Sequence, residues 1–97
     1  MAILIAETNV RLCVPETPGK PFRRDELVLL LGGPVEVIVL MHLKNGRAMC
    51  MAINAEARIQ KMSLMNPFAT EIFRMFQDSP QYIVGKALLC KVPEEME

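Results

Sequence analysis

The chain has 97 residues and a mass of 10.9 kDa, which is enough for one compact domain and too little for two. With 52% hydrophobic residues and a mean hydropathy of +0.25 it can bury a core, which excludes a disordered tail. Its 11 basic side chains balance 11 acidic ones, so it lacks the positive field that draws proteins onto nucleic acid. Because uncharged copies of a small apolar protein repel each other little, the same balance favours a homo-oligomer.

The cysteines and the apolar stretches indicate the compartment. Three cysteines are an odd number, and the N-terminus shows no signal-peptide pattern, so we expect the reducing cytoplasm and not a secreted disulfide scaffold. The longest apolar stretch, residues 27–41, is interrupted by Gly32-Gly33-Pro34 and carries Glu36, well short of the roughly 20 residues of a membrane span. The sequence therefore predicts no transmembrane segment.

The first third of the chain predicts two strands, a loop and a short helix. Apolar residues in Ala2–Ala6 and the period-two alternation of Val10–Val14 predict two strands that pair as a hairpin. The prolines of Pro15–Pro21 predict a loop. Leucines at helical spacing in Arg23–Leu31 predict a helix, which Gly32-Gly33 ends.

A central hairpin is predicted from two apolar stretches, Val35–Leu43 and Ala48–Asn54. Asn45-Gly46 between them indicates a type I′ turn, whose two central residues both need positive φ. With these two as the loop, the register pairs Met41 with Cys50. Both faces of the hairpin are apolar, so each face needs a cover.

The C-terminal part predicts a strand, a helix and a last strand. Arg58–Leu64 has the alternation of a strand, and Asn66-Pro67 is typical of a helix start because asparagine caps well and proline suits the first turn. Tyr82–Val92 predicts a strand in which Gly85 marks a bulge or a close backbone approach. Residues 94–97 form an acidic tail, and residues 1–93 form the single domain.

The predicted fold class is α+β: a mainly antiparallel sheet of four to six strands with two helices packed on one face. The expected helix anchors are the apolar residues at helical spacing, Leu27, Leu30, Leu31, Phe68, Ile72, Phe73 and Phe76.

The histidine and the cysteines of the chain do not form the patterns of a catalytic or metal-binding site. His42 is the single histidine, and the register places it on the face opposite Cys50, so a Cys–His nucleophile pair is not expected. A structural zinc site needs four closely spaced Cys or His ligands, whereas Cys13, Cys50 and Cys90 lie far apart in sequence. We expect no enzyme, no metal and no cofactor.

Small-ligand binding has a weak candidate site. Gly32-Gly33 either only ends the helix or also leaves amides exposed to a ligand. Glu36 and Glu56 are expected near each other at the open end of the hairpin, either as an acid–base pair or as solvated charges. The residues that a nucleotide or other anion would contact are Arg23, Arg24, Gly32, Gly33, Asn54 and Glu56.

Eight methionines are more than a small core needs. Methionine adapts to irregular surfaces and serves both cores and interfaces, so both uses stay open. The candidate interface residues on the central strands are Met41, Met49, Met51 and Met62.

Several ordered motifs carry a family resemblance. They are Phe22–Gly33 followed by Val35-Glu36-Val37, then Asn54-Ala55-Glu56-Ala57, Leu64-Met65-Asn66 with Ala69-Thr70, and Ile83-Val84-Gly85 with Leu88. Together they resemble domain of unknown function 3846, a family of small phage, plasmid and bacterial proteins. Ala57 stands where that family usually has a turn glycine, and Lys86 where it typically has an acid. The resemblance implies a compact α+β domain carried by mobile elements, and it implies no activity.

These observations predict a non-enzymatic small binding protein, a phage or mobile-element accessory factor that occupies a host or viral protein partner in the host cytoplasm. The alternative is a protein that binds or sequesters a nucleotide or another anion. Neither membrane nor nucleic-acid binding is expected.

Overall fold

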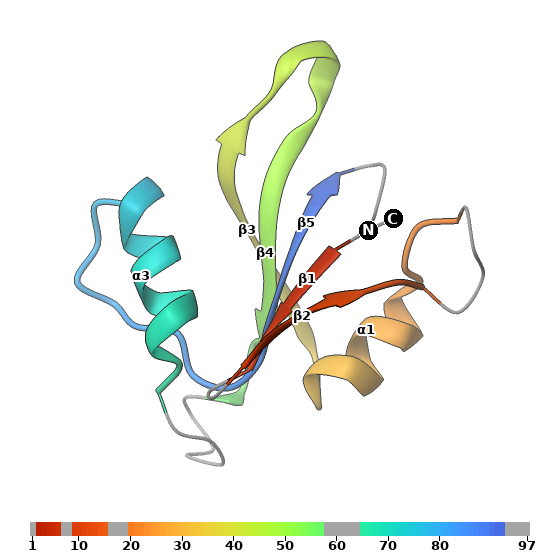
Figure 1. Cartoon of the computed structure of the whole chain (residues 1–97), viewed down its shortest axis with the longest axis horizontal. Helices are drawn as coiled ribbons and strands as arrows, with labels where there is room; N and C mark the ends of the chain where they lie inside the picture. Colours follow the sequence, from red (N-terminus) through yellow and green to blue (C-terminus); the bar gives the residue numbers. More distant parts are fainter. Residues whose placement is uncertain (1, 7–8, 16–19, 58–64, 93–97) are drawn as a thin grey trace.

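The structure is a computed structural model that describes residues 2–6, 9–15, 20–57 and 65–92. Its elements are β1 (Ala2–Ile5), β2 (Val10–Cys13), α1 (Arg24–Leu31), β3 (Val35–His42), the 3-10 turn η1 (Lys44–Gly46), β4 (Ala48–Asn54), α3 (Pro67–Phe76) and β5 (Ala87–Val92). The five strands form one antiparallel sheet with the order β2-β1-β5-β4-β3 (Figure 1). This confirms the α+β class, the antiparallel sheet and the two helices. The predicted strand at 58–64 and the acidic tail lie outside the described residues.

The last strand in the sequence lies in the centre of the sheet. β5 pairs with β1 on one side, where Leu4 is opposite Leu88, and with β4 on the other, where Ala52 is opposite Leu88. The hairpins β1–β2 and β3–β4 therefore form the two halves of the sheet, and β5 joins them. Both edges are formed by strands of these hairpins, β2 and β3.

The two helices cover opposite faces of the sheet. Cys50 and Ala52 of β4 belong to the same buried cluster as α1, whereas Met51 and Ile53 belong to the cluster of α3. Successive side chains of a strand point to opposite faces, so the two clusters are separated by the sheet, and Figure 1 shows the helices on its two sides. The expectation of both helices on one face is wrong. Because both faces of β4 are apolar, each needs a helix of its own.

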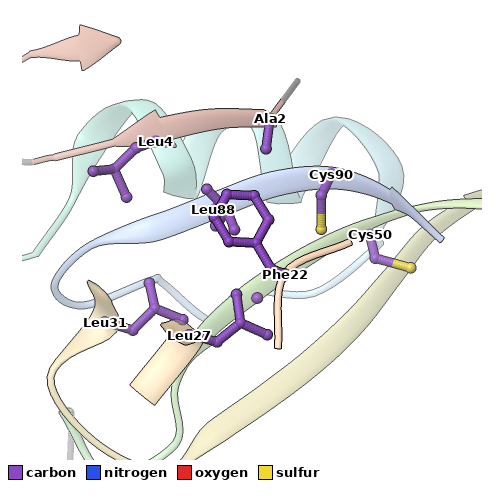
Figure 2. Packing of buried hydrophobic residues seen from close by; sticks show 9 residues of the cluster. Ala2, Leu4, Phe22, Leu27, Leu31, Cys50, Leu88 and Cys90 are labelled. Atoms are coloured by element: carbon purple, nitrogen blue, oxygen red, sulfur yellow. The ribbon is translucent and has the colours of Figure 1, made fainter. Parts of the chain in front are cut away.

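The α1 face has a core of small and medium side chains. Figure 2 shows Phe22, Leu27 and Leu31 lying over the strands. The strand residues beneath them are Ala2, Leu4, Cys50, Ala52, Leu88 and Cys90, all at most 2% exposed. An eight-residue helix is too short to be stable alone, so packing on this face holds it.

α3 packs on its face of the sheet through one side of the helix. Ala69 and Phe73 are buried and Ile72 is half-buried, but Phe68 is 49% exposed and Phe76 37% exposed. The prediction that Phe68 and Phe76 are anchors is wrong. Phe68 is turned away from Phe73 around the helix, and Phe76 lies in the last turn.

Asn66 fixes the start of α3, as predicted for an N-cap. Its Oδ1 accepts a hydrogen bond from the N–H of Ala69 at 3.1 Å. Its Nδ2 donates to the carbonyl oxygens of Ile5 at 2.9 Å and Gly85 at 2.8 Å. Asn66 is fully buried, so one side chain joins the helix, β1 and the segment before β5.

The β3–β4 turn forms as predicted, but the register does not. Asn45 and Gly46 have φ values of 62° and 73°, and the N–H of Arg47 donates to the carbonyl of Lys44, which confirms the turn. Cys50 pairs with Val39, two residues from the predicted partner Met41. One residue of the shift arises at the turn, where Leu43 N–H donates to Arg47 O, and one at a bulge between Val39 and Met41.

The last strand is shorter than predicted. β5 begins at Ala87, and the segment before it makes only a bridge between Val84 and Met65. Gly85 has a φ of 80°, which interrupts an extended strand. The backbone of Ile83 bonds instead to the Thr70 hydroxyl and to the N–H of Asn66.

No helix in the described segments is long and apolar enough to cross a membrane.

Candidate functional site

The turn after β4 is locked onto the end of α1 by one asparagine. Asn54 Nδ2 donates to the carbonyl of Leu31 at 3.4 Å, and its Oδ1 accepts from the N–H of Glu56 at 2.9 Å. Gly33 lies directly against this side chain, because a Cβ on Gly33 would be 2.8 Å from Asn54 Nδ2. The close approach requires glycine at position 33. Three of the predicted ligand residues are thus engaged with one another.

A pocket of about 210 Å³ opens beside this junction. Its lining residues are Leu29, Leu30, Leu31, Gly32, Asn54, Ala57, Gly85 and Lys86. The structure thus brings Gly32 and Asn54 together as predicted, and it adds Gly85 and Lys86, which the site prediction missed. Gly85 was predicted only as a bulge or a close backbone approach, and no pattern in the sequence relates Gly85 or Lys86 to the Asn54 turn.

The electrostatics of this pocket do not match a strong anion site. It lies at the C-terminal end of α1, where the helix dipole is negative and exposed carbonyls attract donors and cations. Lys86 is the charged side chain of its lining. The pocket therefore offers one cation beside acceptor groups.

The two predicted arginines lie elsewhere. Arg23 precedes α1 and Arg24 is its first residue, so about 12 Å of helix separates them from Gly32. Arg23 Nε forms ion pairs of 3.3 Å with both Asp25 and Glu26. The structure does not bring the arginines to the pocket.

Glu36 and Glu56, expected near each other either as an acid–base pair or as solvated charges, lie on β3 and in the turn after β4. Glu36 lines a small pocket with Ile53, Asn54 and Tyr82. Glu56 lies in the turn after β4 and binds Asn54 through its backbone N–H. Glu36 is exposed, and Glu56 is half-buried.

A second hollow of about 420 Å³ runs along the outer side of α3. Its lining includes Thr70, Arg74, Met65 and Met75. Arg74 donates to the carbonyls of Gln81 and Pro80 at 3.1 and 2.8 Å, and Thr70 binds the backbone of Ile83. Because Thr70 and Arg74 hold the segment before β5, the remaining lining consists of Met65, Met75, Pro67 and Glu71.

The cysteines gather on the α1 face without forming a reactive site. Cys13, Cys50 and Cys90 all belong to the cluster on this face, and Cys50 lies directly opposite Cys90. Burial raises the pKa of the Cys50 thiol above its ordinary value of 9.0, which favours the unreactive neutral form. All three are free thiols.

Strand pairing also disfavours a disulfide between Cys50 and Cys90. The N–H of Ala55 donates to the carbonyl of Pro34, so the backbone groups of Ala55 point toward β3. Backbone groups of successive residues point to alternate sides of a strand, so those of Cys50, five residues earlier, point toward β5. Cys50 and Cys90 therefore form a hydrogen-bonded pair, the wider kind, with Cβ atoms about 5.5 Å apart against about 3.8 Å in a disulfide.

The one-residue shift at the β3–β4 turn changes the face on which His42 lies. His42 pairs with Ala48, which shares a face with Cys50, so the prediction that His42 and Cys50 lie on opposite faces is wrong. A register shift of one residue moves a side chain to the other face of the sheet. His42 is exposed whereas Cys50 is 2% exposed, so the two side chains occupy different environments. Within the described segments, no group of His, Cys, Asp and Glu side chains could hold a metal ion.

The predicted methionine interface is only partly on the surface. Met41 is 41% exposed and pairs with the half-buried Met49. Met51 is 0% exposed because it lies in the second strand from the edge, on the α3 face, and it belongs to the core. Met62 lies outside the described residues.

No family model matches the chain, and neither a curated protein nor a solved structure matches it significantly. The resemblance to domain of unknown function 3846 stays a prediction. The class is defined by the fold: an α+β protein with a five-stranded antiparallel sheet and one helix on each face.

Proposed function

We propose that this protein is a non-enzymatic binding protein, an accessory factor of a phage or mobile element that acts in the host cytoplasm by occupying a host or viral protein. The proposal includes self-association of the chain. The observation that carries it is an apolar area that α3 leaves uncovered on its own face of the sheet. We call this area, made by Met41, Met49 and Phe76, the methionine surface.

The position of α3 accounts for the exposure of the methionine surface. The helix ends at Phe76, and the next residue, Gln77, donates from Nε2 to the carbonyl of Val39 at 2.8 Å. Beyond this point, β3 and β4 continue toward their turn without a helix over them (Figure 1). Met41 and Met49 lie in that continuation, on the face of α3.

The chemistry of the methionine surface suits a protein partner. Methionine side chains are flexible and polarisable, so they adapt to a partner's shape, and an aromatic ring adds a rigid contact. Phe76 follows Ile72 and Phe73 at helical spacing, so it is directed to the same side of α3 as these two residues. An apolar partner segment would bury the parts of these side chains that are now exposed to water.

A pair of matched variants tests the proposed function. Met41→Lys combined with Met49→Lys places two charges on the methionine surface, and we expect it to abolish capture of the partner from lysate of the native host. Met75→Lys is the control, because Met75 is 73% exposed on another side of α3. Capture that is equal for both variants, or that no wild-type bait achieves, would contradict the proposal.

A second candidate function, binding of a small ligand, is favoured by the pocket between Gly32, Asn54 and Lys86. Its volume of about 210 Å³ is below the roughly 300 Å³ at which drug-sized ligand pockets begin, so it suits a compound smaller than a nucleotide. A ligand at 100 times its Kd would stabilise the fold by about 2.7 kcal/mol. Thermal denaturation with phosphate, small carboxylates and nucleotides tests this, with Lys86→Gln as the control that should lose any shift.

A further inference from the structure

The strand β2 forms an edge of the sheet, and none of the described strands pairs with its outer side. It carries the most exposed apolar side chains of the sheet, Val10 at 53% and Leu12 at 66%, and Val14 just beyond its end is 62% exposed. Exposed apolar edges of this kind promote pairing with another strand. Among the described elements, the one that contacts β2 extensively is its hairpin partner β1.

The hydrogen bonds of the β1–β2 hairpin show which backbone N–H and C=O groups of β2 point outward. The N–H of Ala6 donates to the carbonyl of Asn9 at 2.8 Å, so Ala6 and Asn9 form a hydrogen-bonded pair. In an antiparallel ladder such pairs alternate with residues whose N–H and C=O point away from the neighbour. Since Ile5 pairs with Val10 and Ile3 with Leu12, the backbone groups of Val10 and Leu12 point outward.

The outward pattern continues one step past β2. Val14 is the next residue in the alternation, and Pro15 after it restricts Val14 to extended conformations. Val10, Leu12 and Val14 thus offer donors and acceptors at regular spacing, and their side chains share one face. The set is symmetric about Leu12.

We infer that a second copy of this chain adds to the edge, with β2 antiparallel to β2 of the other copy around a two-fold axis at Leu12. In this register Leu12 pairs with Leu12 of the second copy, and Val10 pairs with Val14. About six backbone hydrogen bonds form, and the apolar stripe continues across the junction. The two sheets become one sheet of ten strands.

Charge selects this register over its neighbour. Pairing Val10 with Leu12 of the second copy would set Arg11 directly opposite Arg11, and like charges in that position destabilise a sheet. The register centred on Leu12 places Arg11 opposite Cys13 of the second copy. With no net charge on the chain, little long-range repulsion opposes association.

The inference deepens the proposed self-association and uses a surface different from the methionine surface. β2 and β3 are at opposite edges of the sheet. A contact through about five residues per copy is smaller than the roughly 800 Å² per partner of a standard interface, so we expect a dimer that dissociates on dilution.

Sedimentation velocity over a concentration series tests the dimer. We expect the wild-type mass to rise from 10.9 kDa toward twice that value, and we expect Leu12→Lys to stay a monomer because it sets two lysines opposite each other. Val37→Lys is the matched control: Val37 is 40% exposed on the other edge strand, and its variant should associate like wild type. Equal association of Leu12→Lys and wild type, or a monomeric wild type throughout, would overturn the inference.

A backbone measurement tests the register. In the dimer, amide hydrogen exchange at Val10, Leu12 and Val14 slows as concentration rises, while exchange at Arg11 does not change, because its N–H already bonds to β1. Unchanged exchange at all three outward amides would contradict the pairing. Leu12→Lys should retain partner capture, and the Met41→Lys/Met49→Lys variant should retain dimerisation, so each proposal can fail without the other.

Discussion

The two edges of the sheet are protected very differently. β3 is the long edge, with eight residues, and its exposed valines face the α1 side. A bulge between Val39 and Met41 distorts it, and the Gln77 side chain occupies the outward carbonyl of Val39. β2 has four residues, and in the described part of the chain it has neither a bulge nor a side-chain cap. Among the described residues, the fold thus protects the edge next to α3, whereas β2 has β1 as its single strand partner.

The largest change in the free energy of unfolding is expected from removing the Asn66 side chain, which fixes the position of α3. Asn66→Ala deletes the helix cap and leaves the carbonyls of Ile5 and Gly85 without their buried donor, so we expect a loss of about 2–4 kcal/mol in the free energy of unfolding. Urea denaturation followed by circular dichroism measures it. Because the cap on β3 depends on the position of α3, amide exchange at Glu36 and Ile38, whose N–H groups point toward β4, should also rise.

The exposed Asn9 provides the control for that variant. Asn9→Ala keeps the backbone bond to Ala6 and should change the free energy of unfolding by less than about 0.5 kcal/mol. If Asn66→Ala cost no more than Asn9→Ala, the anchoring of α3 by Asn66 would be wrong.

A smaller effect is expected from opening the protected edge itself. Gln77→Ala removes the bond to Val39 O and should cost about 1 kcal/mol. Made together with Leu12→Lys, which closes the β2 edge, it should restore some association, now through β3. Light scattering at high concentration measures this, and Gln81→Ala in the same background is the control. A strictly monomeric double variant would show that the bulge alone protects β3.

The smallest effect concerns Cys50, which lies in the interior of the sheet, away from both edges. Its pKa is raised by burial above 9.0, so at pH values above about 9 the unfolded chain loses this proton while the folded chain keeps it. The unfolded state then binds fewer protons, so stability falls as pH rises. The urea midpoint between pH 8 and 10 should therefore fall less in Cys50→Ala than in wild type.

Wild type and Cys50→Ala are compared in the same buffers across this pH series. Identical slopes for Cys50→Ala and wild type would remove the assigned role of Cys50. Alkylation should also modify the half-buried Cys13 before the buried Cys50 and Cys90.

Local signals explain which elements were predictable. The Asn66 cap, the prolines and the Asn45-Gly46 turn act within a few residues, so their consequences could be predicted without the rest of the molecule. The β3–β4 register was not predictable in this way, because one residue of its shift comes from a bulge near Leu40, which is buried in the cluster of α3. The other residue of the shift, at the turn, reversed the predicted face of His42.

The candidate sites divide along the same line. Gly32 and Asn54 were found because a helix stop and a strand end are marked in the sequence. Lys86 was missed, since its place in the pocket follows from the position of β5 between the two hairpins. Arg23 and Arg24 were grouped with Gly32 because they are close in sequence. In space, a helix of eight residues separates the two arginines from Gly32.

The sequence by itself determined the α+β class, the antiparallel strands, both helix starts and the need to cover two apolar faces, because periodicity and capping are local properties. Only the tertiary structure decided that each face receives one helix, that β5 enters the centre of the sheet, and that β2 and β3 become the edges. These choices depend on contacts between residues distant in sequence, such as Asn66 with Ile5 and Gln77 with Val39. Some of the apolar side chains that the core does not bury thus lie at the methionine surface and along the β2 edge.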